Sequence, residues 1–234
     1  SQQPFNPRLA GVEWPDTIIP IVRSILVTPS GPASSVNGDI IPFRMTPHQQ
    51  DANTYWCDPV RASGRIGFAV DVTDPSNEGN NSLGIHRARV TVGGEVVFAL
   101  VNDRLSYDTI NSGAVSYHPF FIKEGPYLCL WRWRGNATPA FNQGIWDGWW
   151  DVGQEPEDVV ISLSDFAGNE VTVTIPLLRE EWPRLPETVA TENGGNGRVT
   201  MACYGEYVVL SAEFPAAEPT APILVLDDLA PEEG

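Results

Sequence analysis

Residues 64–108 contain two runs in which apolar and polar residues alternate, and Gly93-Gly94 joins the two runs. Alternation places successive side chains on opposite faces of a half-buried β-strand. Two adjacent glycines supply the positive φ angles that a two-residue hairpin turn requires. The stretch shows no pattern typical of a catalytic nucleophile with its base, or of a set of metal ligands. It therefore predicts β-sheet structure.

Short strands are expected along most of the chain, because its 21 glycines and 21 prolines favour turns over helices. No stretch shows the sustained 3.6-residue period of a helix. Pro20 lies near the start of the first strand and predicts an exposed sheet edge, open to dimerisation by strand addition. The predicted strands are residues 18–27, 40–45, 65–73, 85–92, 95–102, 126–134, 159–164 and 170–178. This spacing predicts an all-β fold, an Ig-like antiparallel β-sandwich with a Trp-rich loop insertion and an extra C-terminal β-hairpin segment.

Composition divides the 234 residues into five parts. They are an extended lead-in (residues 1–16), the sandwich (17–180), a polar linker (181–197), a β-hairpin segment or partial second β domain (198–228) and an acidic tail (229–234). About 40 residues are marginal as an independent core, so the hairpin segment either pairs with the sandwich or begins a second domain. Within the sandwich, residues 47–58 are predicted to be a polar loop.

The net charge of −16 excludes most partners that are themselves polyanions. Binding a nucleic acid requires a basic protein surface, and an anionic membrane surface is disfavoured for the same reason. No run of about 18 apolar residues is present, so no membrane span is predicted. The composition agrees with an extracytoplasmic binding or spacer module, and no cofactor is expected.

The three cysteines, Cys57, Cys129 and Cys203, cannot form a closed set of disulfides because their number is odd. One bridge with one free thiol, or three buried free thiols, would both satisfy the count. The sequence alone does not separate these alternatives.

The sharpest candidate for ligand binding is aromatic, because five of the eight tryptophans lie within twenty residues of each other. Indole faces stack on sugar rings, and neighbouring amides and carboxylates bind hydroxyl groups. The alternative is that the tryptophans pack a long loop onto the sandwich, since tryptophan side chains are mostly buried. The candidate ligand-binding residues are Trp131, Trp133, Trp146, Trp149, Trp150, Asn142 and Asp147.

Two groups of acidic and amide side chains are candidates for chemical sites. The first group places oxygen-bearing side chains around one loop, as in calcium sites: Asp71, Asp74, Asn77, Glu78 and Asn80. The preference of Asp and Asn for turns explains this group more simply. The second group could contain the pair of catalytic carboxylates of a glycosidase: Asp147, Asp151, Glu155, Glu157 and Asp158. An exposed acidic loop is the simpler interpretation of this group. We therefore predict no metal ligand and no catalytic residue.

A series of short motifs carries a family resemblance. In chain order they are Gly64-Arg65-Ile66-Gly67-Phe68, residues 71–74, Asn81-Ser82-Leu83-Gly84-Ile85, residues 90–97, residues 103–108, residues 130–136 and residues 164–169. Together they resemble the Ig-like region downstream of the catalytic domain in bacterial lysostaphin-type (LytM-like) zinc peptidoglycan endopeptidases. The resemblance covers roughly residues 6–178, and its specificity lies in the order and spacing of the motifs.

The resemblance implies a non-catalytic accessory region that positions a peptidase or binds the cell wall. In that family an Asn-Pro pair follows the catalytic domain, and here Asn6-Pro7 stands near the first residue. The zinc site of the peptidase requires paired histidines and an aspartate, whereas His48, His86 and His118 are widely separated. The implied partners are peptidoglycan or another glycan and, if the chain is a fragment of a longer protein, its own peptidase domain. A carbohydrate-binding module and, less favoured, a hydrolase remain the alternatives.

Overall fold

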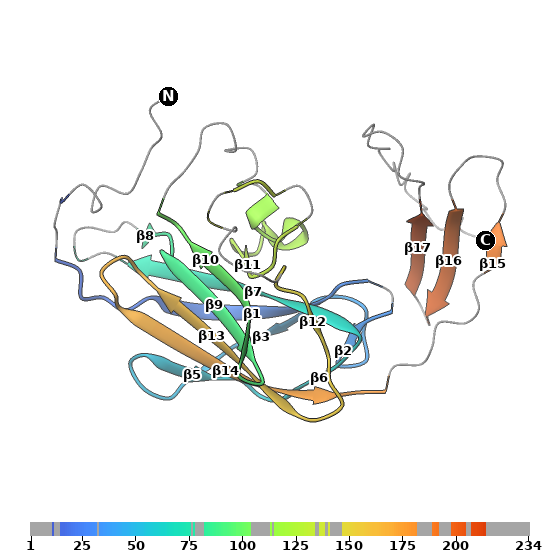
Figure 1. The fold of residues 1–234 in the computed structure, drawn as a ribbon, viewed down its shortest axis with the longest axis horizontal. Coiled ribbons are helices and arrows are strands. Elements are labelled where there is room, and N and C mark those ends of the chain that lie inside the picture. Colours follow the sequence, from blue (N-terminus) through green and yellow to red (C-terminus); the bar gives the residue numbers. More distant parts are fainter. Residues whose placement is uncertain are drawn as a thin grey trace, which may run out of the picture. The chain divides into compact units, whose positions relative to one another are not determined.

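The computed structural model describes residues 11, 15–31, 33–75, 77, 82–103, 113, 115–133, 136–138, 140, 147–181, 189–191, 198–204 and 207–213. The chain divides into two compact units, residues 1–184 and residues 185–234, and each is described by itself. In the first unit two β-sheets pack face to face (Figure 1). The predicted all-β sandwich is therefore confirmed. No helix in the described residues is long and apolar enough to cross a membrane.

The first sheet is built around β7 (Arg65–Pro75), which pairs antiparallel with β1 (Ile21–Pro29). β1 pairs on its other side with β3 (Phe43–Met45), so it is an inner strand. The predicted exposed edge at residues 18–27 is wrong, because Pro20 lies just before the paired residues and blocks no hydrogen bond of the strand. Three short strands also pair with β7: β8 (Ser82–Leu83), β11 (Leu128–Cys129) and β12 (Trp150–Asp151).

The second sheet has eight strands. In spatial order its main path is β10 (Glu95–Val101), β9 (Arg87–Val92), β13 (Glu157–Ser164), β14 (Glu170–Arg179), β5 (Thr54–Trp56) and β4 (His48–Gln49). Beside this path, β6 (Val60–Ser63) pairs with β14 and with β2 (Ser35–Val36). Residues 47–58, predicted as a loop, thus contribute two strands, because burial of the Tyr55 side chain ties this segment to β14.

The hairpin predicted at Gly93-Gly94 is confirmed by β9 and β10. Glu95 pairs with Val92, so the two glycines form the whole turn, and their φ angles are +55° and +90°. These values fit a tight turn in which both central residues have positive φ.

The strand β7 is buried on both faces, not on one. Ile66, Phe68 and Val70 point into the core between the sheets, whereas Ala69 belongs to a second apolar cluster on the outer face. That face is covered by side chains of residues 115–133 and 147–149, here called the covering segment, which includes β11 and the 3-10 helix η3 (Pro119–Phe121) and is drawn in green to yellow in Figure 1. The first sheet is therefore the middle layer of three.

The second unit contains one antiparallel sheet in the order β15 (Val189–Thr191), β16 (Arg198–Tyr204) and β17 (Tyr207–Glu213). β16 and β17 confirm the hairpin predicted after residue 198. β15 lies inside the predicted linker, which is thus partly a strand that pairs with β16. The acidic tail lies outside the described residues.

Candidate functional site

The covering segment forms a compact aromatic layer on the outer face of the first sheet. Leu26 of β1 and Ala69 of β7 form its floor. The side chains of Tyr127, Cys129 and Trp131 lie on this floor and are fully or almost fully buried. The partly buried rings of Phe121, Trp133 and Trp149 surround them. Leu26 and Ala69 alternate with core residues of the same strands, which explains the unbroken apolar runs Ile25–Val27 and Phe68–Val70.

The tryptophans of this layer pack against each other. The ring centroid of Trp131 lies 4.8 Å from that of Trp149 and 5.5 Å from that of Trp133, with interplanar angles of 37° and 72°. The rings are tilted or edge-on to their neighbours, so they do not form a flat platform. Gly67 makes this packing possible, because a Cβ atom there would lie 2.9 Å from both the Trp131 and Trp149 rings.

The structure separates the predicted ligand-binding residues into different environments. Trp131 has no exposed surface, because its ring fills the space above β7, and this burial favours the packing alternative over ligand stacking. Trp133 and Trp149 are partly buried against it, and Trp150 packs on the main core while its Nε1 donates to Glu157 Oε2 at 2.9 Å.

Asp147 is exposed and pairs with Arg65, whose guanidinium Nη2 donates to both carboxylate oxygens at 3.0 and 2.9 Å. This pair links the covering segment to the start of β7. Trp146 and Asn142 lie outside the described residues. Asp147 and Glu157, two members of the acidic group weighed as a glycosidase pair, therefore both bond to protein groups.

Three carboxylates meet where the lead-in, the end of β7 and the β13–β14 turn come together. Oxygen atoms of Asp16, Asp74 and Asp165 all lie within 4.8 Å of one another. Oxygen ligands at such spacing could hold a hard divalent cation. Asp165 already accepts hydrogen bonds from the backbone N–H groups of Gly168 (2.7 Å) and Asn169 (2.9 Å) and from the Asn169 side chain (2.7 Å). Its observed role is therefore to cap the turn.

The loop weighed as a calcium site is not assembled as the sequence suggested. Asp71 faces Arg23 at 3.8 Å, whereas Asp74 joins the carboxylate group just described. Asn77 exchanges hydrogen bonds with Thr17. Glu78 and Asn80 lie outside the described residues.

Cys57 and Cys129 are free thiols, buried in the core between the two sheets and in the cluster on the outer face of the first sheet, respectively. Desolvation raises the pKa of each thiol to about 12, and the Asp58 carboxylate adds to the effect at Cys57. A thiol reacts through its thiolate, so neither residue is expected to alkylate in the native protein. Iodoacetamide at pH 8, followed by peptide mass spectrometry, should modify both residues in urea and neither in native buffer. Rapid labelling of either one without urea would contradict the structure.

His118 is buried among the rings of Phe120, Phe121 and Trp131. Neither ring nitrogen has a hydrogen-bond partner among the described residues, and burial lowers the pKa of the imidazole. Below about pH 6.5 the His118 imidazole is therefore protonated more readily in the unfolded state than in the folded state. Such a group contributes stability above that pH and loses the contribution as the pH falls.

The free energy of unfolding is accordingly expected to decrease between pH 6.5 and pH 5, with a slope of up to about 1.4 kcal/mol per pH unit from His118. Urea titrations at several pH values would measure the slope. His118→Phe should remove this part of the slope, whereas His48→Phe, at a half-exposed histidine, should retain it. Equal slopes in the native protein and His118→Phe would assign the pH dependence to other groups.

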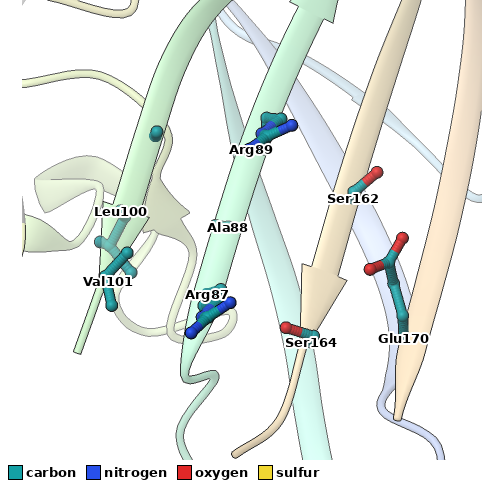
Figure 2. Close-up of a pocket in the computed structure, with 9 residues that line it drawn as sticks. Arg87, Ala88, Arg89, Leu100, Val101, Ser162, Ser164 and Glu170 are labelled. Atoms are coloured by element: carbon teal, nitrogen blue, oxygen red, sulfur yellow. The ribbon is translucent and has the colours of Figure 1, made fainter. Parts of the chain in front are cut away.

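A hollow on the outer face of the second sheet was not predicted from the sequence. It has a volume of about 290 Å³, and Figure 2 shows the residues that line it. Arg87 and Arg89 come from β9, Ser162 and Ser164 from β13, and Glu170 from β14. The sequence does indicate that the two arginines share one face of the strand, because they flank the buried Ala88. Their partners across the sheet could not be read from that pattern.

A second hollow of about 340 Å³ adjoins the first and shares Arg87 and Ser164 with it. It is further lined by His86, Asp103 and the β13–β14 turn. His86 Nε2 lies 2.7 Å from Asp103 Oδ1, and the His86 ring packs on Phe166 with a centroid distance of 4.4 Å. We call the two hollows together the arginine groove.

Comparisons with known proteins identify no family. No family model matches the sequence, and no curated protein matches it. Among solved structures, the apo structure of Bacteroides uniformis beta-glucuronidase 3 aligns with 74% of this chain and 15% of that chain, at 11% identity and a TM-score of 0.21. The chain thus corresponds to a small fraction of that protein's length. A TM-score this low supports no conclusion about fold or activity.

Proposed function

We propose that this chain is a non-catalytic accessory β-sandwich of a bacterial cell-wall-directed zinc peptidase, acting outside the cytoplasm. The observation that carries the proposal is the ordered set of motifs that resembles the region downstream of such catalytic domains. The described motif residues serve the scaffold: Gly67 admits two tryptophan rings, Trp131 covers β7, and Asp165 caps a turn. Residues of this kind maintain the shape of a module, which supports an accessory role.

The environments of the histidines support an accessory role. His48 faces Asp58, His86 faces Asp103, and His118 is enclosed by aromatic rings. The close group of metal-ligand side chains found among the described residues is made of three aspartates and contains no histidine. A peptidase zinc site is built from histidine nitrogens together with a carboxylate, so this arrangement favours a module that assists a separate catalytic domain.

The carbohydrate-binding alternative has less support. Its stacking residues would be the tryptophans, but Trp131 is buried and Trp133 and Trp149 use their ring surfaces against it. A titration of tryptophan fluorescence with glycan oligosaccharides and muropeptides would test this alternative. No shift or quench at millimolar ligand would eliminate it.

The accessory role is tested by hydrolysis assays on purified peptidoglycan. The chain alone, supplied with zinc, is expected to release no soluble fragments. The reading frame upstream of Ser1 is expected to encode a His-x-His strand and an earlier His and Asp. In a protein that joins both parts, removing residues 17–180 should reduce cleavage of intact cell walls more than cleavage of a soluble peptide substrate.

Two outcomes would contradict the proposal. Turnover of peptidoglycan by this chain alone, surviving a chelator, would make it an enzyme in its own right. An upstream reading frame without the zinc-ligand pattern would remove the peptidase from the proposal.

A further inference from the structure

We propose that the arginine groove is a binding site for a short, extended, acidic peptide. The site lies on the outer face of the second sheet, away from the tryptophan layer on the first sheet. It goes beyond the accessory role and does not depend on the identity of a neighbouring catalytic domain.

The first argument is the charge of the groove. Arg23, Arg44 and Arg65 each pair with a carboxylate of this chain, namely Asp71, Glu124 and Asp147. Arg87 and Arg89 are exposed, and neither makes an ion pair with a described residue. Glu170, Asp103 and Asp165 also line the groove but make no ion pair with these arginines, so the two adjacent guanidinium groups can bind carboxylates of a ligand. Arginine is also the side chain that best matches the two oxygens of a carboxylate.

The second argument is the spacing of the donors. Arg87 pairs with Ser164 across the sheet, and Arg89 pairs with Ser162. Each arginine therefore stands beside one serine hydroxyl. The two Arg–Ser pairs are two residues apart, or about 6.8 Å along the strand. Alternate side chains of an extended peptide have the same separation. A peptide lying along β9 could thus place two carboxylates, two residues apart, against the two Arg–Ser pairs.

The third argument is the presence of acidic groups in the same groove. Glu170 stands opposite Ser164 on β14, and Asp103 lines the adjoining hollow. These carboxylates would repel a uniformly charged polyanion, such as a phosphate polymer. A peptide that carries one ammonium group beside its carboxylates satisfies Arg87, Arg89 and Glu170 together. The Phe166 ring packs on His86, so the side that it turns to His86 is not available for stacking a sugar.

The groove also brings together two sequence motifs that are distant along the chain. Asp103 begins the motif of residues 103–108, and residues 165–168 belong to the Asp-Phe-Ala-Gly-Asn turn. The hydrogen bonds of Asp165 fix that turn, and the hydrogen bond between His86 and Asp103 fixes the opposite side. The end of the groove is therefore held by bonded side chains.

The test uses the full chain labelled with nitrogen-15 and the synthetic peptide acetyl-Glu-Ala-Glu-Lys-amide, titrated at low salt. Saturable shifts are expected at the backbone amides of residues 87–89 and 162–164. Arg87→Gln and Arg89→Gln should each raise Kd about tenfold, the size of one charge-assisted hydrogen bond. Arg61→Gln is the matched control, because Arg61 is an exposed strand arginine outside the groove. It should leave Kd unchanged.

Variation of the peptide and of Glu170 tests the chemistry that is recognised. The analogue acetyl-Gln-Ala-Gln-Lys-amide should bind at least tenfold more weakly, since it lacks both carboxylates. Glu170→Gln should weaken binding of the lysine-containing peptide and strengthen binding of a version that ends in alanine. Thermal unfolding followed by circular dichroism should show that every variant is folded, because the altered side chains are exposed.

Several results would overturn the proposal. They are the absence of saturable shifts, equal binding of the Gln analogue, and an equal loss in Arg61→Gln. Tighter binding of an oligogalacturonate or of inorganic phosphate would reassign the groove to acidic sugars or to phosphate. None of these results bears on the accessory role, which is tested by the hydrolysis assays.

Discussion

Replacing Trp131 by alanine is expected to lower the free energy of unfolding of the first unit by about 3–5 kcal/mol. The side chain has no exposed surface and contacts the rings of Trp133, Trp149 and His118. Its removal would leave a large cavity above β7 and would uncouple the covering segment from the sheet. Urea unfolding followed by far-ultraviolet circular dichroism would measure the change.

Trp56→Ala is the matched control for this experiment. Trp56 is 44% exposed on β5 and packs on one side against His48. Its loss is expected to cost about 1 kcal/mol or less, as for most exposed side chains. A small effect of Trp131→Ala on stability, together with a loss of glycan binding, would instead indicate that Trp131 binds a ligand.

Local sequence patterns predicted much of the second sheet. The alternation in residues 87–92 and 95–101 places Val90, Val92 and Leu100 in the core, and Gly93-Gly94 form the turn between them. The β13–β14 pair could likewise be predicted from its alternation and its Asp165 turn. These features depend on neighbours in the sequence, which is why the sequence alone indicates them.

The layer on the outer face of the first sheet could not be predicted in this way. The strands β1 and β7 carry apolar residues on both faces, and this pattern does not say what covers the second face. Residues 127–131 alternate as a strand, but the rest of the covering segment has no regular period, and its side chains reach Leu26 and Ala69, which are far away in the sequence. Trp131, Trp133 and Trp149 pack together in this layer, whereas Trp150 packs on the main core, and this division depends on long-range contacts.

The arginine groove shows the same division between local and long-range information. Alternation indicates that Arg87 and Arg89 share a face of β9. Only the register between β9 and β13 brings Ser164 and Ser162 beside them. Sheet register between strands distant in sequence is set by the whole core, and so the site emerges only from the assembled fold.

Gly148→Ala is expected to destabilise the first unit by about 3 kcal/mol, for two separate reasons. The φ angle of Gly148 is +86°, which is strained for any residue with a side chain. An added Cβ atom would also lie 2.4 Å from the Leu130 carbonyl oxygen and 2.5 Å from the Trp131 Cα atom. These are backbone atoms that cannot move without displacing the covering segment from β7.

Gly94→Ala separates the two effects, because Gly94 has a φ angle of +90° and its Cβ position is open. Its expected cost is about 1 kcal/mol, from backbone strain alone. Urea unfolding of both variants gives the difference, which measures how tightly the backbone near Gly148 fits over Trp131. If both glycines cost the same, the backbone at residues 130–131 yields to a side chain, and the tryptophan layer is then a loose cover that a ligand could displace.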